Sequence, residues 1–198
     1  MPPLSSKGKT TMKDMIVLMG GQGVGKGTFS KMLRARHDYN YIETGAMFRS
    51  LPADSAIAKL IAAGNLVPDP ELFKLVASKI TNTKDLLIDG FPRTLPQAQW
   101  LVKNYADKFA IHILYLDVPE EIMIKRINKR INEGGGRADD ADAAAVRRRL
   151  DTFWHVTMPA IEWLRTAGGI KFSDVDVTGP VDENFARILA AMESQKTK

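Results

Sequence analysis

A glycine-rich loop around one lysine is the stretch of the sequence best suited to chemistry. Residues 20–29 read GGQGVGKGTF and directly follow the apolar run MIVLM at residues 15–19. Glycine loses more conformational freedom on folding than any other residue, so its repeated use indicates that something must approach the bare backbone. The spacing G-x-x-x-x-G-K-G-T between a strand and a helix is typical of a phosphate-binding loop, whose N–H groups turn toward a polyphosphate. An ordinary glycine turn is the alternative, and the flanking strand and helix argue against it.

Three polar side chains could act together with this loop. Lys26 is placed to reach the β and γ phosphates of a nucleotide, and Thr28 to set a hydroxyl beside Mg²⁺. Asp89 ends the apolar run at residues 85–89, and ligands bind at the carboxyl ends of strands in open α/β sheets. We therefore expect Asp89 to hold Mg²⁺ directly or through waters, with a turn cap as the alternative.

Arginines recur at positions that could surround a phosphate. Arg126 and Arg130 are four residues apart, so they share one face of an expected helix at residues 119–131. Any one arginine taken alone fits an ordinary solvated position. Together with a phosphate loop they suggest a cationic cage for phosphoryl transfer, which depends mostly on positioning and charge stabilisation. The candidates are Arg49, Arg93, Arg126, Arg130, Arg137, Arg148 and Arg149.

The surrounding sequence alternates strand-like and helix-like segments. Apolar runs predict strands at residues 15–19, 39–42, 85–89, 110–116 and 169–172. Amphipathic stretches predict helices at 28–36, 71–80, 96–104, 119–131, 143–166 and 181–192. This order predicts an α/β fold, with a five-stranded parallel sheet covered by helices on both faces in three layers.

Two segments interrupt the alternation. Residues 45–68 predict short helices and turns, and residues 132–143 are rich in glycine and charge. Each could be a plain surface loop or a moving lid. We expect one domain over residues 15–198, preceded by a disordered basic tail at residues 1–14.

Composition narrows the classes of protein. The 198-residue chain has no cysteine, which excludes disulfides and thiolate zinc sites, and its three histidines share no ligand spacing. No run approaches 18 apolar residues, so no membrane span is expected, and residues 1–13 lack the apolar stretch of a secretory signal. We expect a cytoplasmic protein. The net charge of +5 suits an anionic partner, either nucleotide or nucleic acid.

The motifs together resemble the adenylate kinase family, within the nucleoside monophosphate kinases. They occur in the family's order and cover most of residues 15–192: GGQGVGKGT, ETGAMFR, GNLVPD, LIDGFPRTLPQAQ, LDVPEEIMIKRINKR and GRADD…VRRRL. The resemblance implies a phosphate-loop core of the P-loop NTPase type, an AMP-binding segment at about 45–68 and a short lid at about 132–143. It also implies reversible transfer of the γ-phosphoryl of Mg·ATP to AMP, giving two ADP. ATP, AMP and ADP would be the partners of a monomer that binds no nucleic acid and no membrane.

The resemblance also assigns roles to individual residues. Thr44 and Gln97 would read the adenine of AMP, and Arg49 and Arg93 would hold its phosphate. The implied AMP-binding set is Thr44, Gly45, Arg49, Val67, Gly90, Arg93 and Gln97. The implied ATP-binding set is Gly21, Gly23, Val24, Gly25, Lys26, Gly27, Thr28 and Arg126, the last against the adenine. The transferred group would be surrounded by Lys26, Arg93, Arg130, Arg137, Arg148 and Arg149.

Four departures from the family pattern leave alternatives open. Gln22 replaces the usual proline of the loop, and Ala46 replaces the usual aspartate of the TGDM motif. The segment between residues 49 and 64 is several residues shorter than usual. The spacing from Arg137 to Arg149 is one residue longer, so either Arg148 or Arg149 could reach the phosphates.

Two other functions therefore stay open. One is a UMP/CMP or broad-specificity monophosphate kinase. In the UMP/CMP kinases the equivalents of Thr44 and Thr94 are usually alanine and asparagine, so these two threonines favour AMP. The other is a non-catalytic protein of the same fold that binds nucleotides or nucleic acid.

Overall fold

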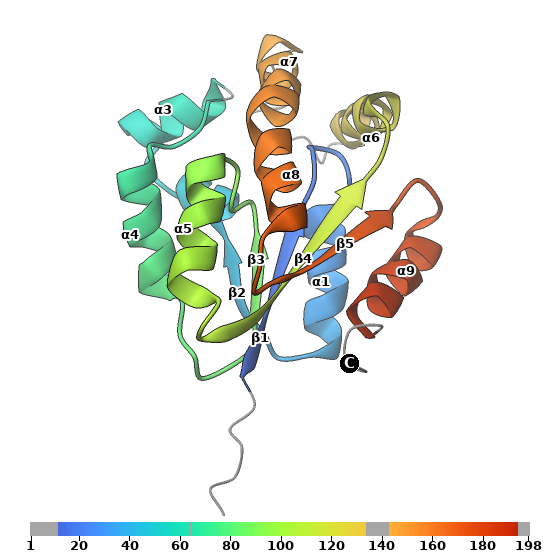
Figure 1. Ribbon diagram of the computed structural model, residues 1–198. Coiled ribbons are helices and arrows are strands. Elements are labelled where there is room, and N and C mark those ends of the chain that lie inside the picture. Colours follow the sequence, from blue (N-terminus) through green and yellow to red (C-terminus); the bar gives the residue numbers. More distant parts are fainter. Residues whose placement is uncertain (1–11, 64, 134–142, 194–198) are drawn as a thin grey trace, which may run out of the picture.

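The sheet at the centre of the molecule is parallel and five-stranded, as the sequence predicts. The computed structural model describes residues 12–63, 65–133 and 143–193. Within them the strand order is β2-β3-β1-β4-β5 (Figure 1). The strands are β1 (Lys13–Met19), β2 (Asn40–Glu43), β3 (Leu86–Asp89), β4 (Phe109–Asp117) and β5 (Lys171–Asp176). All neighbouring pairs run parallel.

Helices cover both faces of this sheet, which confirms the three-layer α/β/α arrangement. Figure 1 shows α5 and α8 on one face and α1 and α9 on the other. Four helices contact the strands or one another here: α1 (Lys26–Arg36), α5 (Leu95–Tyr105), α8 (Met158–Thr166) and α9 (Val181–Glu193). Helix α4 (Asp69–Lys79) lies beside α5, where Phe73 stacks on Trp100. The others rise around the carboxyl edge of the sheet: α2 (Thr44–Arg49), α3 (Ala56–Ala62), α6 (Glu120–Asn132) and α7 (Ala143–Thr152). None of the described helices is long and apolar enough to cross a membrane.

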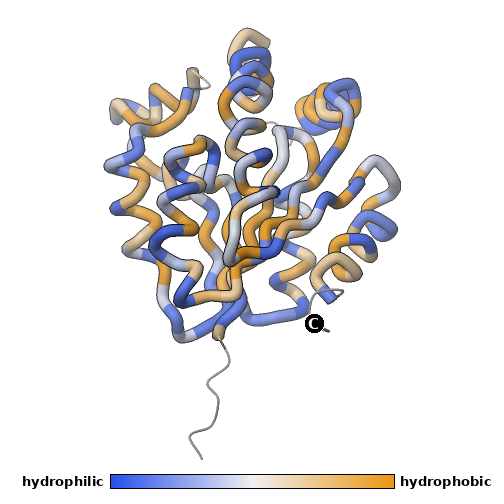
Figure 2. Tube along the Cα trace, in the orientation of Figure 1, coloured by the Kyte–Doolittle hydropathy of each residue, from blue (hydrophilic) through white to orange (hydrophobic). Residues whose placement is uncertain are grey.

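The core lies in the sheet and under its covering helices. Every residue of β3 is buried, as are the last five of β1 and most of β4. Figure 2 shows these strands as the most hydrophobic part of the trace. A parallel sheet covered on both faces needs such continuous apolar strands, since neither face meets water.

Most elements lie within two residues of their expected ranges, and two differ more. The last strand is Lys171–Asp176 rather than residues 169–172, because residues 167–170 form the turn before it, with Gly169 at a φ of +78°. It lies at the edge of the sheet and contains the polar residues Ser173 and Asp174, so its sequence does not form a continuous apolar run. The expected helix at 143–166 is interrupted by a π-helical turn at Phe153–Thr157. This turn directly precedes the Met158–Pro159 start of α8, where proline cannot donate to the preceding helical turn.

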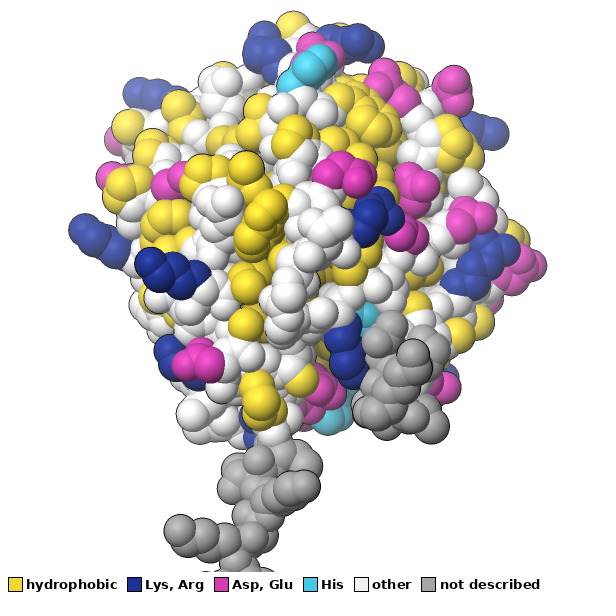
Figure 3. All heavy atoms as spheres, viewed as in Figure 1, with side chains coloured by type: hydrophobic (Ala, Val, Ile, Leu, Met, Phe, Trp, Pro, Cys, Tyr) yellow, Lys and Arg dark blue, Asp and Glu magenta, His cyan; other side chains and the backbone are white. Residues whose placement is uncertain are grey.

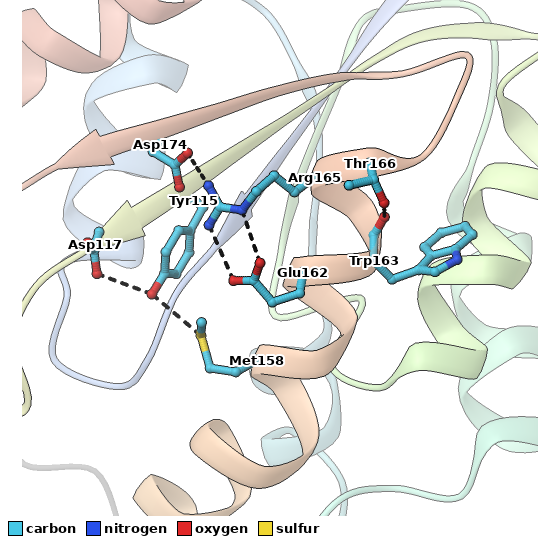
Figure 4. Close-up of polar contacts among 8 residues, drawn as sticks. All are labelled: Tyr115, Asp117, Met158, Glu162, Trp163, Arg165, Thr166 and Asp174. Atoms are coloured by element: carbon cyan, nitrogen blue, oxygen red, sulfur yellow. Dashed lines mark hydrogen bonds and ion pairs between the residues drawn. The ribbon is translucent and has the colours of Figure 1, made fainter.

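Side-chain contacts fix α8 to the edge of the sheet (Figure 4). Arg165 pairs with Asp174 of β5 and with Glu162 of its own helix. Beside them the Tyr115 hydroxyl donates to Asp117 over 3.2 Å. Burial, helped by Asp117, raises the pKa of the Tyr115 phenol, so it stays a hydrogen-bond donor. The arm formed by α7 and α8 is therefore anchored at its α8 end.

Candidate active site

The phosphate loop lies against β4 and α6, and its glycines are what allow this. A Cβ on Gly20 would stand 2.7 Å from the main-chain oxygen of Leu116. On Gly23 it would stand 2.5 Å from the oxygen of Met123, and on Gly21 2.6 Å from the sulfur of the same residue. No real Cβ tolerates such distances to backbone. The glycines therefore let the loop pack closely against its neighbours, in addition to exposing N–H groups to a ligand.

Helix α1 begins at Lys26, two residues before the expected start, and its first turn faces the loop. Its N-cap is Gly25, whose φ of +105° favours glycine. The first turn contains no acidic residue. The Lys26 ammonium donates to the main-chain oxygens of Gly20 and Gly21 at 2.6 and 2.8 Å, so it arches over the loop. Unpaired N–H groups and a lysine at a helix N-terminus form a binding site for phosphate.

A cleft of about 960 Å³ opens at the carboxyl ends of β1 and β3. All the residues that the resemblance implies for ATP, from Gly21 to Thr28 together with Arg126, line it. Its acidic lining residues are Glu43, Asp89 and Glu133. Its basic lining residues are Lys26, Lys31, Arg49, Arg93, Arg126, Lys129, Arg130 and Arg149. This excess of positive charge in a cleft suits a polyanionic ligand.

Asp89 has the chemistry expected for a magnesium site. It pairs in register with Leu18, just before the phosphate loop, is 6% exposed and lines the cleft. Among the described residues no cluster of three or more histidine, aspartate or glutamate side chains could hold a metal alone. Mg²⁺ usually binds through one or two carboxylates together with substrate phosphates, so Asp89 and the Thr28 hydroxyl fit an ion that arrives with a nucleotide.

A second cavity, of about 60 Å³, continues from the cleft toward α3 and α4. Residues that line both are Gly45, Arg49, Leu66, Gly90, Arg93 and Arg149. Thr44, Val67 and Gln97 line the second cavity but not the cleft. All the residues of the expected AMP-binding set therefore line this passage. The short helices predicted within residues 45–68 are α2 and α3, and residues of both line this cavity.

Gly90 joins the parts of this passage. The Thr44 hydroxyl and the Arg93 Nε both donate to its main-chain oxygen, at 2.9 and 2.8 Å. Its φ is +84°, and a Cβ there would stand 2.9 Å from the Thr44 hydroxyl and 3.1 Å from Arg93. A side chain at Gly90 would therefore displace two of the expected AMP-binding residues.

The buried amide of Gln97 is held in one orientation by a residue that sequence reasoning missed. Its Nε2 donates to the Asp69 carboxylate at 2.7 Å, and its Oε1 accepts from the Arg93 main-chain N–H at 2.7 Å. Gln97 is 1% exposed, so no water competes freely for these bonds. The only sequence signal for Asp69 is its place in the GNLVPD motif.

Glu43 is a second residue that was missed. It accepts from Arg49 Nη2 at 2.9 Å and from the Tyr41 hydroxyl at 3.1 Å. Burial, together with the nearby Asp89 carboxylate, raises the pKa of the Tyr41 phenol. Glu43 therefore positions Arg49, although its place beside Thr44 in the ETGAMFR motif was the only hint.

The remaining arginines separate into different places. Arg126 donates to the main-chain oxygens of Val24 at 3.2 Å and Val177 at 2.7 Å, at the side of the cleft. Arg130 and Arg149 line the cleft, whereas Arg148 is not among its lining residues. Arg137 and nearly all of the expected lid lie outside the described residues.

The sequence is similar to those of known proteins. The sequence matches the family model for adenylate kinase over residues 18–169. It is 35% identical over 188 residues to the adenylate kinase of Phocaeicola vulgatus, covering 90% of this chain and 97% of that protein. It is 36% identical over 185 residues to that of Parvibaculum lavamentivorans, covering 84% and 89%. It is 32% identical over 184 residues to that of Thermus thermophilus, covering 89% and 96%. The chain therefore belongs to the adenylate kinase family.

Proposed function

We propose that the protein transfers the γ-phosphoryl group of Mg·ATP reversibly to AMP, giving two ADP. The observation that carries this proposal is the passage from the phosphate-loop cleft to the second cavity, lined by Arg49, Arg93 and Arg149. It offers two nucleotide positions whose phosphates meet between cations. A protein that only binds one nucleotide has no need of the second position.

AMP occupies the second cavity in this proposal. Its adenine lies by Thr44, Val67 and the oriented amide of Gln97, and its phosphate lies between Arg49 and Arg93. Arg49 is paired with Glu43. A phosphate that carries two negative charges attracts that guanidinium more strongly than the single charge of the Glu43 carboxylate.

ATP lies with its phosphates on the loop and the first turn of α1. The N–H groups of residues 21–28 and the Lys26 ammonium bind the β and γ phosphates, and Arg126 lies at the side of the nucleotide. Lys26 exchanges its bonds to two loop carbonyls for phosphate oxygens. Thr28 and Asp89 would hold Mg²⁺ together with the phosphates, and the ion would neutralise part of their charge.

The transfer step needs positioning rather than a proton carrier. An oxygen of the AMP phosphate forms a bond to the γ-phosphorus while the bond to the bridging β–γ oxygen breaks, leaving ADP on both sides. The attacking oxygen is already ionised, so no general base is required. Lys26, Arg93, Arg130 and Arg149 stabilise the charge on the transferred group, and Arg137 stays a prediction outside the described residues. We also infer a cytoplasmic monomer, from the family resemblance alone.

One alternative has a specific observation behind it. Ala46 stands in α2 where the family usually has aspartate. It follows Gly45, which lines the acceptor cavity, so this departure favours a test of other monophosphates. For nucleic-acid binding the support is weaker. On the face in Figure 3, the Lys and Arg side chains that the structure describes are scattered among Asp and Glu rather than gathered into one patch.

The test is ADP formation from Mg·ATP with AMP, dAMP, UMP, CMP or GMP offered in turn, against a control without acceptor. Turnover with AMP and little with the pyrimidines is the expected result. Preferred turnover with UMP or CMP would overturn AMP as the acceptor. Turnover no higher than the control with every acceptor would overturn the enzyme itself.

A further inference from the structure

The side chain that replaces the loop proline reaches out of the loop to another element. Gln22 Nε2 donates to the main-chain oxygen of Val146 over 2.8 Å, joining residues 124 positions apart. Gln22 Oε1 is buried and has no hydrogen-bond partner among the described residues. The amide is therefore directed at one acceptor, and its other polar atom carries a desolvation cost. A proline could not make this bond.

The acceptor belongs to the helix that carries an arginine of the cleft. Val146 lies in the first turns of α7, and Arg149 follows it by three residues, so the two share a helix face. Arg149 lines both the cleft and the second cavity. The placement of this part of α7 relative to the loop thus sets where the Arg149 guanidinium stands.

The two ends of the connection differ in how firmly they are held. The loop is held on the α6 side, because Gly21 and Gly23 lie too close to Met123 for a Cβ to fit between them. The arm is anchored lower down, where the buried Thr157 hydroxyl donates to the Arg93 main-chain oxygen over 2.9 Å. Between that anchor and Val146 lies most of the π-helical turn, a kind of interruption often found at functional sites. In the upper part of the arm Arg147 pairs with Glu120 of α6 and Arg148 donates to Ala63, and Gln22 supplies the tie to the phosphate loop.

We propose that Gln22 is a positioning residue that ties α7 to the phosphate loop and so holds Arg149 over the transferred phosphoryl group. The proposal rests on the proposed function, because it uses the role given there to Arg149. The tie is a single neutral hydrogen bond, so it orients the helix without locking it. Its loss misplaces Arg149 while leaving the loop, Lys26 and the ATP phosphates where they are.

The test compares Gln22→Met, which keeps the length of the side chain and removes the amide, with a matched control. The control is Asn104→Leu. The Asn104 amide also donates to a helix carbonyl, that of Trp100 at 2.8 Å, but Asn104 does not line the cleft. Hydrogen exchange of the amides at residues 143–152 should become faster in Gln22→Met and stay unchanged in Asn104→Leu. Unchanged exchange in Gln22→Met would overturn the tie, whatever reaction the protein catalyses.

A double-mutant cycle then tests the link to Arg149. In the wild-type background Gln22→Met should lower kcat about tenfold, with the KM for ATP within about twofold, since misplacing a group by a small distance costs turnover rather than binding. In the Arg149→Met background the same substitution should change kcat by less than about twofold, because residues that act as a unit are not additive. Equal effects in the two backgrounds would overturn positioning through Arg149. If the wild-type protein has no transferase activity, the proposed function is overturned. The hydrogen-exchange experiment would still test whether Gln22 ties α7 to the loop.

Melting temperature separates this role from a structural one. Since Gln22 Oε1 is buried without a partner, Gln22→Met should leave the melting temperature unchanged or raise it. A fall in melting temperature that accompanies the fall in kcat would mean that Gln22 serves the stability of the loop, and would overturn the proposal.

Discussion

Arg148 on α7 donates from Nε to the main-chain oxygen of Ala63, 2.8 Å away at the end of α3. This bond links the two elements that flank the mouth of the cleft, although 85 residues separate them in the chain. The next residue, Arg149, lines the cleft and the second cavity instead. The sequence alone did not distinguish these two arginines. In the structure Arg148 lies at the rim of the cleft and Arg149 lies inside it.

Replacing each of these arginines by methionine should separate their roles. Arg149→Met should lower kcat by about 100-fold or more, because it removes a charge aimed at the transferred group. Arg148→Met should change kcat by less than about fivefold and act mainly on the KM for AMP, because a rim hydrogen bond contributes modestly. Steady-state kinetics with both substrates varied measures this. A larger loss of kcat in Arg148→Met than in Arg149→Met would reverse the assignment.

The Asp69–Gln97 pair should control recognition of the acceptor base. In Asp69→Asn the Gln97 amide loses its charged acceptor, so it can rotate and present the wrong atom to adenine. We expect the KM for AMP to rise about tenfold with the KM for ATP unchanged, since a buried hydrogen bond to a charged group contributes about 1.5–3 kcal/mol. Glu71→Gln, an exposed change on the same helix, is the control. Equal shifts in both KM values would point to a general disturbance of the cleft.

Lys26→Met should abolish most turnover while the protein stays folded. The ammonium donates to the main-chain oxygens of Gly20 and Gly21, and methionine keeps the length of the aliphatic side chain without this charge. In the transfer step it removes charge stabilisation, which costs about 100-fold to 1,000-fold in kcat for a single donor. Circular dichroism and a melting curve check the fold. Near-normal activity in this variant would remove Lys26 from the mechanism.

The sequence predicted the parts of the fold that are written in local patterns. Runs such as MIVLM and DLLID are buried on both faces, and they appear as β1 and β3 in a parallel sheet. The phosphate loop could also be predicted from the sequence, because its glycines, lysine and threonine lie in one short segment. The edge strand β5 was misplaced, since half of its residues meet solvent and carry polar side chains.

The pairings that orient the site side chains could not be read in the same way. Gln22 meets Val146 across 124 residues, and Gln97 meets Asp69 across 28, so no spacing rule links them. The choice between Arg148 and Arg149 depends on how α7 is rotated about its axis. That rotation is set by tertiary contacts of α7, such as those of Val146 and Arg148, and by the π-helical turn that follows the helix, none of which the periodicity of the sequence reveals.

His112 should make the stability of the protein depend on pH, independently of the active site. It is buried on β4, and its Nε2 lies 2.9 Å from the Ser173 hydroxyl on β5. Burial, with Lys171 nearby, lowers the pKa of His112 from 6.5 to about 4. Between these two pH values the unfolded chain binds a proton that the folded protein does not. The free energy of unfolding should therefore fall by roughly 3 kcal/mol as pH drops through this window, with no contribution from His112 above it.

Urea unfolding at a series of pH values between 7 and 4 measures this dependence. His112→Gln keeps an amide that can bond Ser173 but cannot titrate, so its free energy of unfolding should fall less steeply over the same window. His155→Gln is the matched control, because it makes the same substitution at a histidine that is exposed on the π-helical turn. The comparison depends on slopes rather than absolute stabilities, so a general destabilisation by His112→Gln does not obscure it. Equal slopes in wild type and His112→Gln would mean that carboxylates, and not this buried imidazole, govern acid unfolding.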